Sequence, residues 1–215
     1  MAVHDRIFSR FLFIFGAIRG DKTKNKMIVP KWILKSKNKK IKVRFLQGLF
    51  DSELSKLSRI KDKRAFQSLK YYNCKSIDKI KDGIFFLNQI RKLLSEFKIK
   101  TSKVTLDRQY RRSRDGAIMQ QLFFSIYSNY INLYNFTKQV GFLYNSKRRN
   151  LILKYTSEIK SLASESIKNN KAHDKFIILR KKGLSLKEVA KKLNIKIDLL
   201  KNWLYKGNKP RLYYF

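Results

Sequence analysis

Two short segments of the sequence share a pattern that could place two carboxylates side by side. In each, two small residues lie one helical turn apart and an acidic residue follows at once; the small residues are Gly16 with Gly20 and Gly48 with Ser52, and the acidic residues are Asp21 and Glu53. Small residues at this spacing let two helix backbones approach closely. Carboxylates brought together in this way repel each other unless a cation lies between them, and Mg²⁺ prefers such oxygen ligands. The pattern predicts a metal site at Asp21 and Glu53, although two solvated helix ends would contain the same residues.

A second candidate site lies near the C-terminus. Ser185 and Glu188 have the spacing of a capping box, and Asn194 stands where a turn needs a residue that tolerates positive φ. The amphipathic segments on either side of this turn predict a helix-turn-helix, whose second helix enters the major groove of DNA. The residues expected to face the groove are Lys196, Asp198, Lys201, Asn202 and Lys206. A helical hairpin used only for packing is the alternative.

Basic side chains also gather in the middle of the chain. The loop 108–114 contains Arg108, Arg111, Arg112 and Arg114, which are expected to bind phosphates. The strand expected before this loop alternates polar and apolar residues, so one polar face is free to lie on a groove. A solvated run of like charge is the alternative interpretation.

The spacing of apolar residues predicts the elements that must position these side chains. Helices are expected over residues 5–20, 43–53, 77–94, 133–140 and 146–170, and strands over 65–73, 101–110 and 117–129. Gly141 is expected to end the fourth helix, and the lysine-rich run 35–42 to form a solvated turn. Polar residues 166–171 are expected to separate a domain over residues 1–165 from a helix-turn-helix domain over residues 172–215. We therefore predict an α+β fold, in which an α/β unit precedes an all-α domain.

The net charge narrows the class of partner. The chain has 51 Lys+Arg and 15 Asp+Glu, for a net charge of +36, and its hydrophobic content of 43% is that of a folded protein. A compact protein this basic repels itself unless a polyanion screens it, so nucleic acid is the first partner to consider. A ribosomal or membrane-surface protein is the alternative. The single Cys74 allows no internal disulfide, and the apolar run 11–18 is too short to span a bilayer, so a soluble intracellular protein is expected.

The paired segments around Asp21 and Glu53 resemble the two motifs of the LAGLIDADG, or dodecapeptide, homing endonucleases. Residues 46–54 are the closer match, and residues 90–103 and 134–151 are similar to the second α/β repeat of that family. The resemblance covers about residues 10–155, and the helix-turn-helix follows as an appended domain.

The resemblance implies a curved antiparallel sheet that lies over the major groove of double-stranded DNA, together with the two motif helices. It also implies that Asp21 and Glu53 are catalytic residues that bind Mg²⁺, which activates water to cleave the DNA. Few residues separate the two motifs, so the first repeat is expected to consist of its motif helix alone. Lys22 and Leu54 stand where the motifs end in glycine, and Glu53 stands in place of the usual aspartate.

Three functions are therefore open from the sequence. The first is a Mg²⁺-dependent DNA endonuclease of the homing type, and the second is a catalytically inactive DNA-binding transcriptional regulator built on the same scaffold. The third is an RNA- or ribosome-binding protein. With one sheet, contact with a long DNA site requires either a homodimer or the appended domain.

Overall fold

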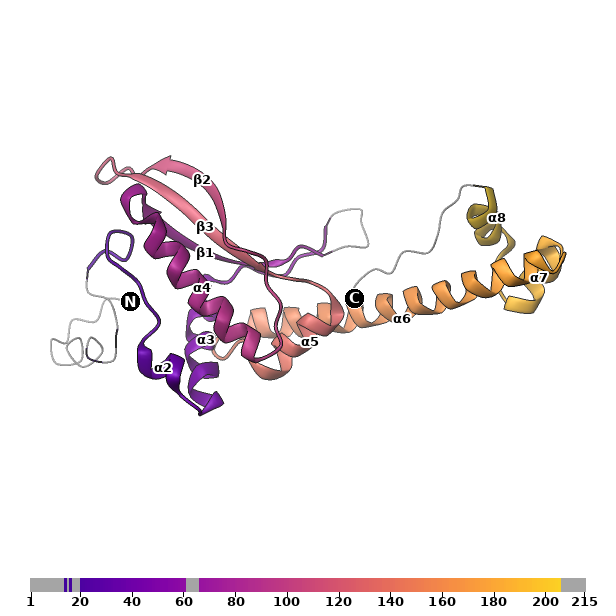
Figure 1. Cartoon of the computed structure of the whole chain (residues 1–215), viewed down its shortest axis with the longest axis horizontal. Helices are drawn as coiled ribbons and strands as arrows, with labels where there is room; N and C mark the ends of the chain where they lie inside the picture. The colour runs from indigo at the N-terminus through magenta and orange to yellow at the C-terminus, as the bar shows by residue number, and fades with distance from the viewer. Residues whose placement is uncertain (1–13, 15, 17–19, 61–65, 206–215) are drawn as a thin grey trace. The chain divides into compact units, whose positions relative to one another are not determined.

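The structure is a computed structural model that describes residues 14, 16, 20–60 and 66–205. It has the predicted α+β fold, with an antiparallel sheet among helices (Figure 1). In chain order its elements are α2 (Lys31–Lys35), α3 (Lys39–Glu53), β1 (Leu69–Ser76), a 3₁₀ turn (Ile77–Lys79), α4 (Ile80–Glu96), β2 (Thr105–Arg111), β3 (Ile118–Ile126), α5 (Tyr130–Gln139), α6 (Ser146–Lys181), α7 (Leu186–Leu193) and α8 (Ile197–Tyr205). Of the helices described, none is long and apolar enough to cross a membrane.

The sheet has three antiparallel strands in the order β1-β3-β2. Tyr71 of β1 lies opposite Phe124 of β3, and Thr105 of β2 lies opposite Phe123. Side chains of β3 alternate between buried and partly exposed, as expected for a central strand with one covered face. A bulge interrupts the pairing of β2 with β3 between Leu106 and Gln109.

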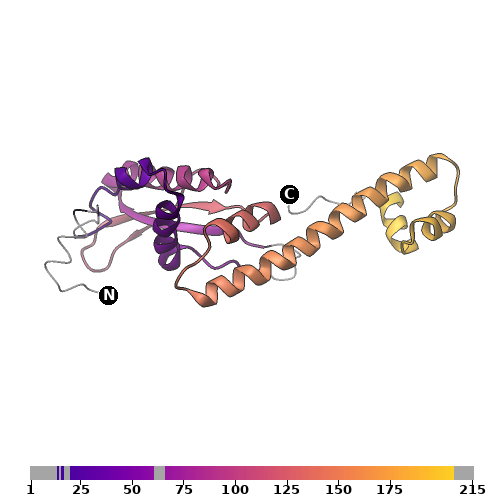
Figure 2. The same cartoon turned by 90° about the horizontal axis from the view of Figure 1, so that it is seen from below.

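Helices cover the inner face of this sheet (Figures 1 and 2). This face buries Leu69, Tyr71, Leu122 and Phe124. Phe50 of α3 packs edge-on against Tyr71 with ring centroids 5.8 Å apart. Helix α4 approaches the sheet closely because residue 83 is glycine: a Cβ at this position would lie 2.4 Å from Leu122 Cδ1 and 2.8 Å from Lys75 Cγ.

Several elements differ from those predicted. The run expected to be a solvated turn is largely helical, because α3 begins at Lys39 and the Asn38 side chain accepts a hydrogen bond from Lys40 N. Lys42, within that run, is buried and its Nζ lies 2.7 Å from Glu96 Oε2. The second strand begins only at Thr105. The helix predicted over residues 5–20 lies outside the described residues, except for positions 14, 16 and 20.

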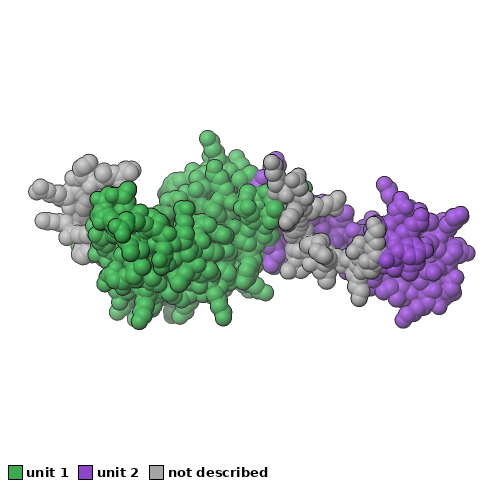
Figure 3. All heavy atoms as spheres, turned by 90° about the horizontal axis from the view of Figure 1, so that it is seen from above, with its two compact units in different colours: residues 1–128, 132–153 green, residues 129–131, 154–215 purple. Residues whose placement is uncertain are grey.

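The chain divides into two compact units (Figure 3). Unit 1 comprises residues 1–128 and 132–153, and unit 2 comprises residues 129–131 and 154–215. The division falls within α6, which continues without a break through residues 166–171, where the sequence predicted a boundary. Lysine is a good helix former, and serine and asparagine do not by themselves end a helix.

Unit 2 contains two short helices, α7 and α8, joined by a turn at Asn194. The end of α6, α7 and α8 pack around Phe176, Val189, Leu200 and Trp203. Ser185 and Glu188 make both hydrogen bonds of a capping box, and Asn194 has φ 51° and ψ 51°, in the left-handed region. These two local predictions are confirmed.

Candidate nucleic-acid interface

The outer face of the sheet combines cationic, aromatic and amide side chains. Because directly opposite residues of an antiparallel pair share a face, the register assigns residues from all three strands to it. They are Lys70, Tyr72 and Cys74 of β1, Gln121, Phe123 and Ser125 of β3, and Thr105 and Tyr110 of β2. None of these residues is acidic. Lys70 is the one charged side chain among them, and it lies among ring and amide groups.

Contacts between the strands hold these side chains in place. Lys70 Nζ lies 4.4 Å from the centre of the Phe123 ring, at cation–π distance. Arg108 Nε donates to Gln121 Oε1 over 3.1 Å, which places Arg108 on the same face. The Cys74 Sγ and Tyr110 hydroxyl oxygen are 3.1 Å apart. Preorganised side chains of this kind lose less conformational entropy when a ligand binds.

The arginines of loop 108–114 do not form one cluster. Arg112 is largely buried and makes ion pairs with Asp115 at 2.6 Å and with Asp21 at 2.8 Å. Arg114 is more exposed, but its Nη2 also binds Asp21. Arg108 and Arg111 have no carboxylate partner among the residues described. Phosphate binding by these arginines stays a prediction, and the contacts favour Arg108 and Arg111, because Arg112 and Arg114 are already paired.

Asp21 and Glu53, the predicted metal ligands, have other partners. The Asp21 carboxylate accepts hydrogen bonds from the backbone N–H and hydroxyl of Thr23 and from Arg112 and Arg114. The Thr23 bonds, together with Arg112, hold the pKa of Asp21 far below its usual range. Glu53 accepts a hydrogen bond from Lys22 Nζ at 2.8 Å.

This donor set does not fit Mg²⁺. Cationic side chains occupy carboxylate oxygens that a metal would need, whereas Mg²⁺ requires near-ideal octahedral oxygen ligation. Within residues 14, 16, 20–60 and 66–205, no group of three His, Cys, Asp or Glu side chains could hold a metal ion. Mg²⁺ binding stays an untested prediction of the sequence, and no catalytic step is derived from it.

The small residues of the paired motifs also differ from the prediction. Gly16 and Gly20 have φ values of 97° and 76°, which do not occur within an α-helix, so these two positions do not present a helical face. Gly48 and Ser52 are in α3, as predicted. Apart from its chain neighbours and the backbone of its own helix, no described atom lies within 4 Å of a Cβ placed on Gly48.

Lys75 is a buried lysine with defined hydrogen-bond partners, and the sequence did not indicate it as a site residue. It is fully buried on the inner face of β1, and its Nζ donates to the carbonyl oxygens of Lys22 and of Asn25, the latter at 2.7 Å. Burial lowers the pKa of this ammonium. The backbone N–H of Ser76 also donates to Thr23 O. Lys75 thus anchors loop 21–25 against the end of β1, a role that no local sequence signal indicates.

The groove-facing residues predicted in unit 2 lie at the surface of α8 and the preceding turn. Lys196 and Lys201 are exposed, and Asn202 is partly exposed. Lys201 Nζ is 4.0 Å from Asp198 Oδ1, and both side chains are more than half exposed, so this pair neutralises Lys201 only weakly. Lys206 lies outside the described residues. DNA binding by this set stays a prediction.

Comparison with curated proteins finds a similarity to the DNA-directed RNA polymerase subunit Rpo1N of Methanocaldococcus jannaschii. The two are 32% identical over 171 residues, which is 77% of this chain. The matched segment is 12% of the length of the polymerase subunit. No protein-family model matches the chain. No solved structure matches it.

These findings correct the functional interpretation of the sequence. The resemblance to LAGLIDADG homing endonucleases is contradicted, because the similarity found is to an RNA polymerase subunit. The prediction of a homing-endonuclease type of function is wrong on the same ground, and the alternative of a DNA-binding transcriptional regulator is not supported.

Proposed function

We propose that this chain is a binding segment for double-stranded DNA, with one surface on the sheet of unit 1 and a second on α8 of unit 2. The observation that carries the proposal is the outer face of the sheet, where Lys70 and Arg108 are held among Phe123, Tyr110 and Gln121. The relative's name, a DNA-directed RNA polymerase subunit, is consistent with a DNA ligand. An intracellular location follows from this proposal.

The dimensions of the sheet suit the major groove. Neighbouring strands lie about 4.8 Å apart, so three strands span about 10 Å. The major groove of B-form DNA is about 12 Å wide and admits β-ribbons. Gln121 offers an amide that can pair with an adenine edge, and Arg108 offers a guanidinium that can bind guanine or phosphate.

The test is duplex binding by two variants of equal net charge. Lys70→Gln/Arg108→Gln removes two cations from the outer face, whereas Lys37→Gln/Lys40→Gln removes two exposed cations at the start of α3. Both lose the same long-range attraction. We expect the first variant to weaken binding to a 20-base-pair duplex at least tenfold more than the second, because each lost charged contact contributes on the order of 1.5 kcal/mol. Equal losses would contradict binding through the sheet.

Unit 2 is tested separately in the full chain. Lys196→Gln/Lys201→Gln should weaken duplex binding more than Lys168→Gln/Lys171→Gln, which removes two exposed cations from α6. The affinity of the unchanged protein should fall steeply between about 50 and 200 mM salt, since each phosphate contact releases condensed counterions.

An A-form RNA duplex of equal length separates DNA from RNA binding, because its deep and narrow major groove cannot admit the sheet. Tighter binding to RNA would overturn the proposal. Sedimentation of the DNA complex measures whether the chain binds as a homodimer, which stays a prediction.

A further inference from the structure

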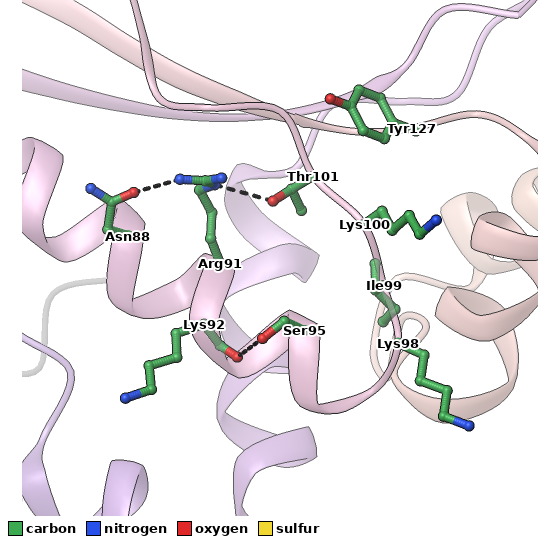
Figure 4. Close-up of a pocket in the computed structure, with 9 residues that line it drawn as sticks. All are labelled: Asn88, Arg91, Lys92, Ser95, Lys98, Ile99, Lys100, Thr101 and Tyr127. Atoms are coloured by element: carbon green, nitrogen blue, oxygen red, sulfur yellow. Dashed lines mark hydrogen bonds between the residues drawn. The ribbon is translucent and has the colours of Figure 1, made fainter.

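A cavity of about 880 Å³ lies in unit 1, and none of the outer-face residues named above lines it (Figure 4). Its walls are the C-terminal half of α4, the connection that follows it and the residue after β3. The lining residues are Asn88, Arg91, Lys92, Ser95, Lys98, Ile99, Lys100, Thr101 and Tyr127. Four of them are cationic, none is acidic, and the volume is within the range of about 300–1,000 Å³ that is usual for small-ligand sites.

Arg91 is held in position within this cavity. Its Nε donates to Thr101 Oγ1 over 3.1 Å, and its Nη1 donates to Asn88 Oδ1 over 2.6 Å. Figure 4 shows the guanidinium between these two acceptors. A guanidinium has five N–H groups, so three of them have no partner among the described residues and can donate to a ligand. An oriented guanidinium of this kind matches a phosphate.

The connection after α4 contributes a second cation at a backbone position that favours glycine. Lys98 has φ 57°, and its N–H donates to Ser95 O over 3.0 Å, which ends the helix. A residue with a Cβ is disfavoured in this region, and glycine is the usual choice there. The sequence has lysine instead, which places a positive charge at the edge of the cavity.

The nearest acidic residue of α4 is turned to another partner. Glu96 binds Lys42 Nζ of α3 through both carboxylate oxygens, at 3.0 and 2.7 Å. It therefore does not neutralise the cavity. Tyr127 supplies a ring that is 43% exposed, and such a ring can stack on a nucleobase.

We propose that this cavity binds a nucleotide, with Arg91 on the phosphate, Lys100 and the other lining lysines adding positive charge, and Tyr127 beside the base. The nucleotide is either free or part of a nucleic-acid strand. The site has no lining residue in common with the duplex-binding surface, and this proposal does not depend on duplex binding.

Titration of the full chain with AMP, adenosine and a 12-nucleotide single strand tests the proposal. Arg91→Gln/Lys100→Gln should weaken AMP binding at least tenfold, whereas Lys81→Gln/Lys138→Gln, with the same net charge and both changes at exposed sites, should change it less than twofold. Adenosine should bind at least tenfold more weakly than AMP, because it lacks the phosphate.

Lys98→Gly tests the site with a variant that is expected to stay folded. Glycine fits φ 57°, so this variant should unfold no more easily than the unchanged protein and should still bind AMP more weakly.

The ligand could also be part of a strand. In that case AMP does not bind, and Arg91→Gln/Lys100→Gln, but not its control, weakens binding of the single strand tenfold, which supports the site. Equal effects of the cavity variant and its control on both ligands would overturn it. Duplex binding by the Lys70 and Arg108 variant is a separate readout, so the two proposals fail independently.

Discussion

Arg112 Nη1 donates a hydrogen bond to the Asp21 carboxylate over 2.8 Å, although 91 positions separate the two residues in the sequence. The same guanidinium binds Asp115 at 2.6 Å. Asp115 in turn binds Lys24 Nζ at 2.9 Å. Ion pairs therefore join loop 21–25 to the turn between β2 and β3, and the pair of Arg112 with Asp21 requires that Asp21 is ionised.

Acidification should loosen this connection. The pKa of Asp21 is lowered in the folded state, chiefly by its hydrogen bonds to Thr23 and then by Arg112, from an unfolded value of about 3.9. A lowered folded pKa gives a stability contribution that is present above about pH 4 and is lost as the pH falls below it. We expect the Tm of Asp21→Asn to fall less between pH 5 and 2.5 than that of the unchanged protein. Asp107→Asn, at an exposed position of β2, is the control and should keep the full dependence on pH.

Gly83→Ala should destabilise unit 1 even though alanine is the better helix former. The added methyl group would meet Leu122 and Lys75, and overpacking of this kind costs about 1–3 kcal/mol. Gly48→Ala is the matched control: it is also within a helix, and no described atom is near its Cβ, so it should gain up to about 1 kcal/mol. Urea unfolding measures both. A large loss at Gly48 would indicate that another backbone packs closely against α3 there.

Asp51 should matter for stability and not for binding. Its carboxylate accepts hydrogen bonds from the backbone N–H groups of Leu143, Tyr144 and Asn145 at 2.9–3.2 Å, and so joins the end of α3 to the segment before α6. Asp51→Ala leaves these donors without their partner, which should lower the free energy of unfolding by about 1–3 kcal/mol. Affinity for a DNA duplex, measured well below the Tm, should change less than twofold. A tenfold loss of affinity in the folded variant would place Asp51 at the interface.

Substitution at Asn194 tests the turn between α7 and α8. Asn194→Gly should leave unit 2 as stable as before or more so, because glycine adopts φ 51° without strain. Asn194→Val should destabilise it by about 1–2 kcal/mol, since a β-branched residue is strongly disfavoured there. Helical circular dichroism during thermal unfolding gives the comparison, and equal Tm values for the two variants would contradict the left-handed turn.

Features that depend on nearby residues could be predicted from the sequence. The capping box at Ser185, the left-handed Asn194 and the glycine C-cap at Gly141, with φ 61°, all follow from local backbone chemistry and are confirmed. The α+β class and the three strands followed from apolar periodicity, although their ends moved by several residues.

Features that depend on distant partners could not be predicted. A lysine is expected to be exposed, yet Lys42 and Lys75 are buried, because Glu96 and two backbone carbonyls accept the hydrogen bonds of their ammonium groups. The sequence predicted Asp21 to be a metal ligand, because no local pattern indicates its actual partners. These are Arg112 and Arg114, which lie 91 and 93 positions away in the sequence. The resemblance to homing endonucleases rested on residue spacing alone, and the similarity to an RNA polymerase subunit contradicted it.

The bulge in β2 has a consequence for solubility. β2 is an edge strand, exposed along its whole length, and a regular edge of this kind offers free N–H and C=O groups to any other extended chain. The irregular pairing between Leu106 and Gln109, together with the arginines beside it, makes a continuous new ladder difficult to form. The bulge therefore disfavours the pairing of another extended chain along the full length of β2.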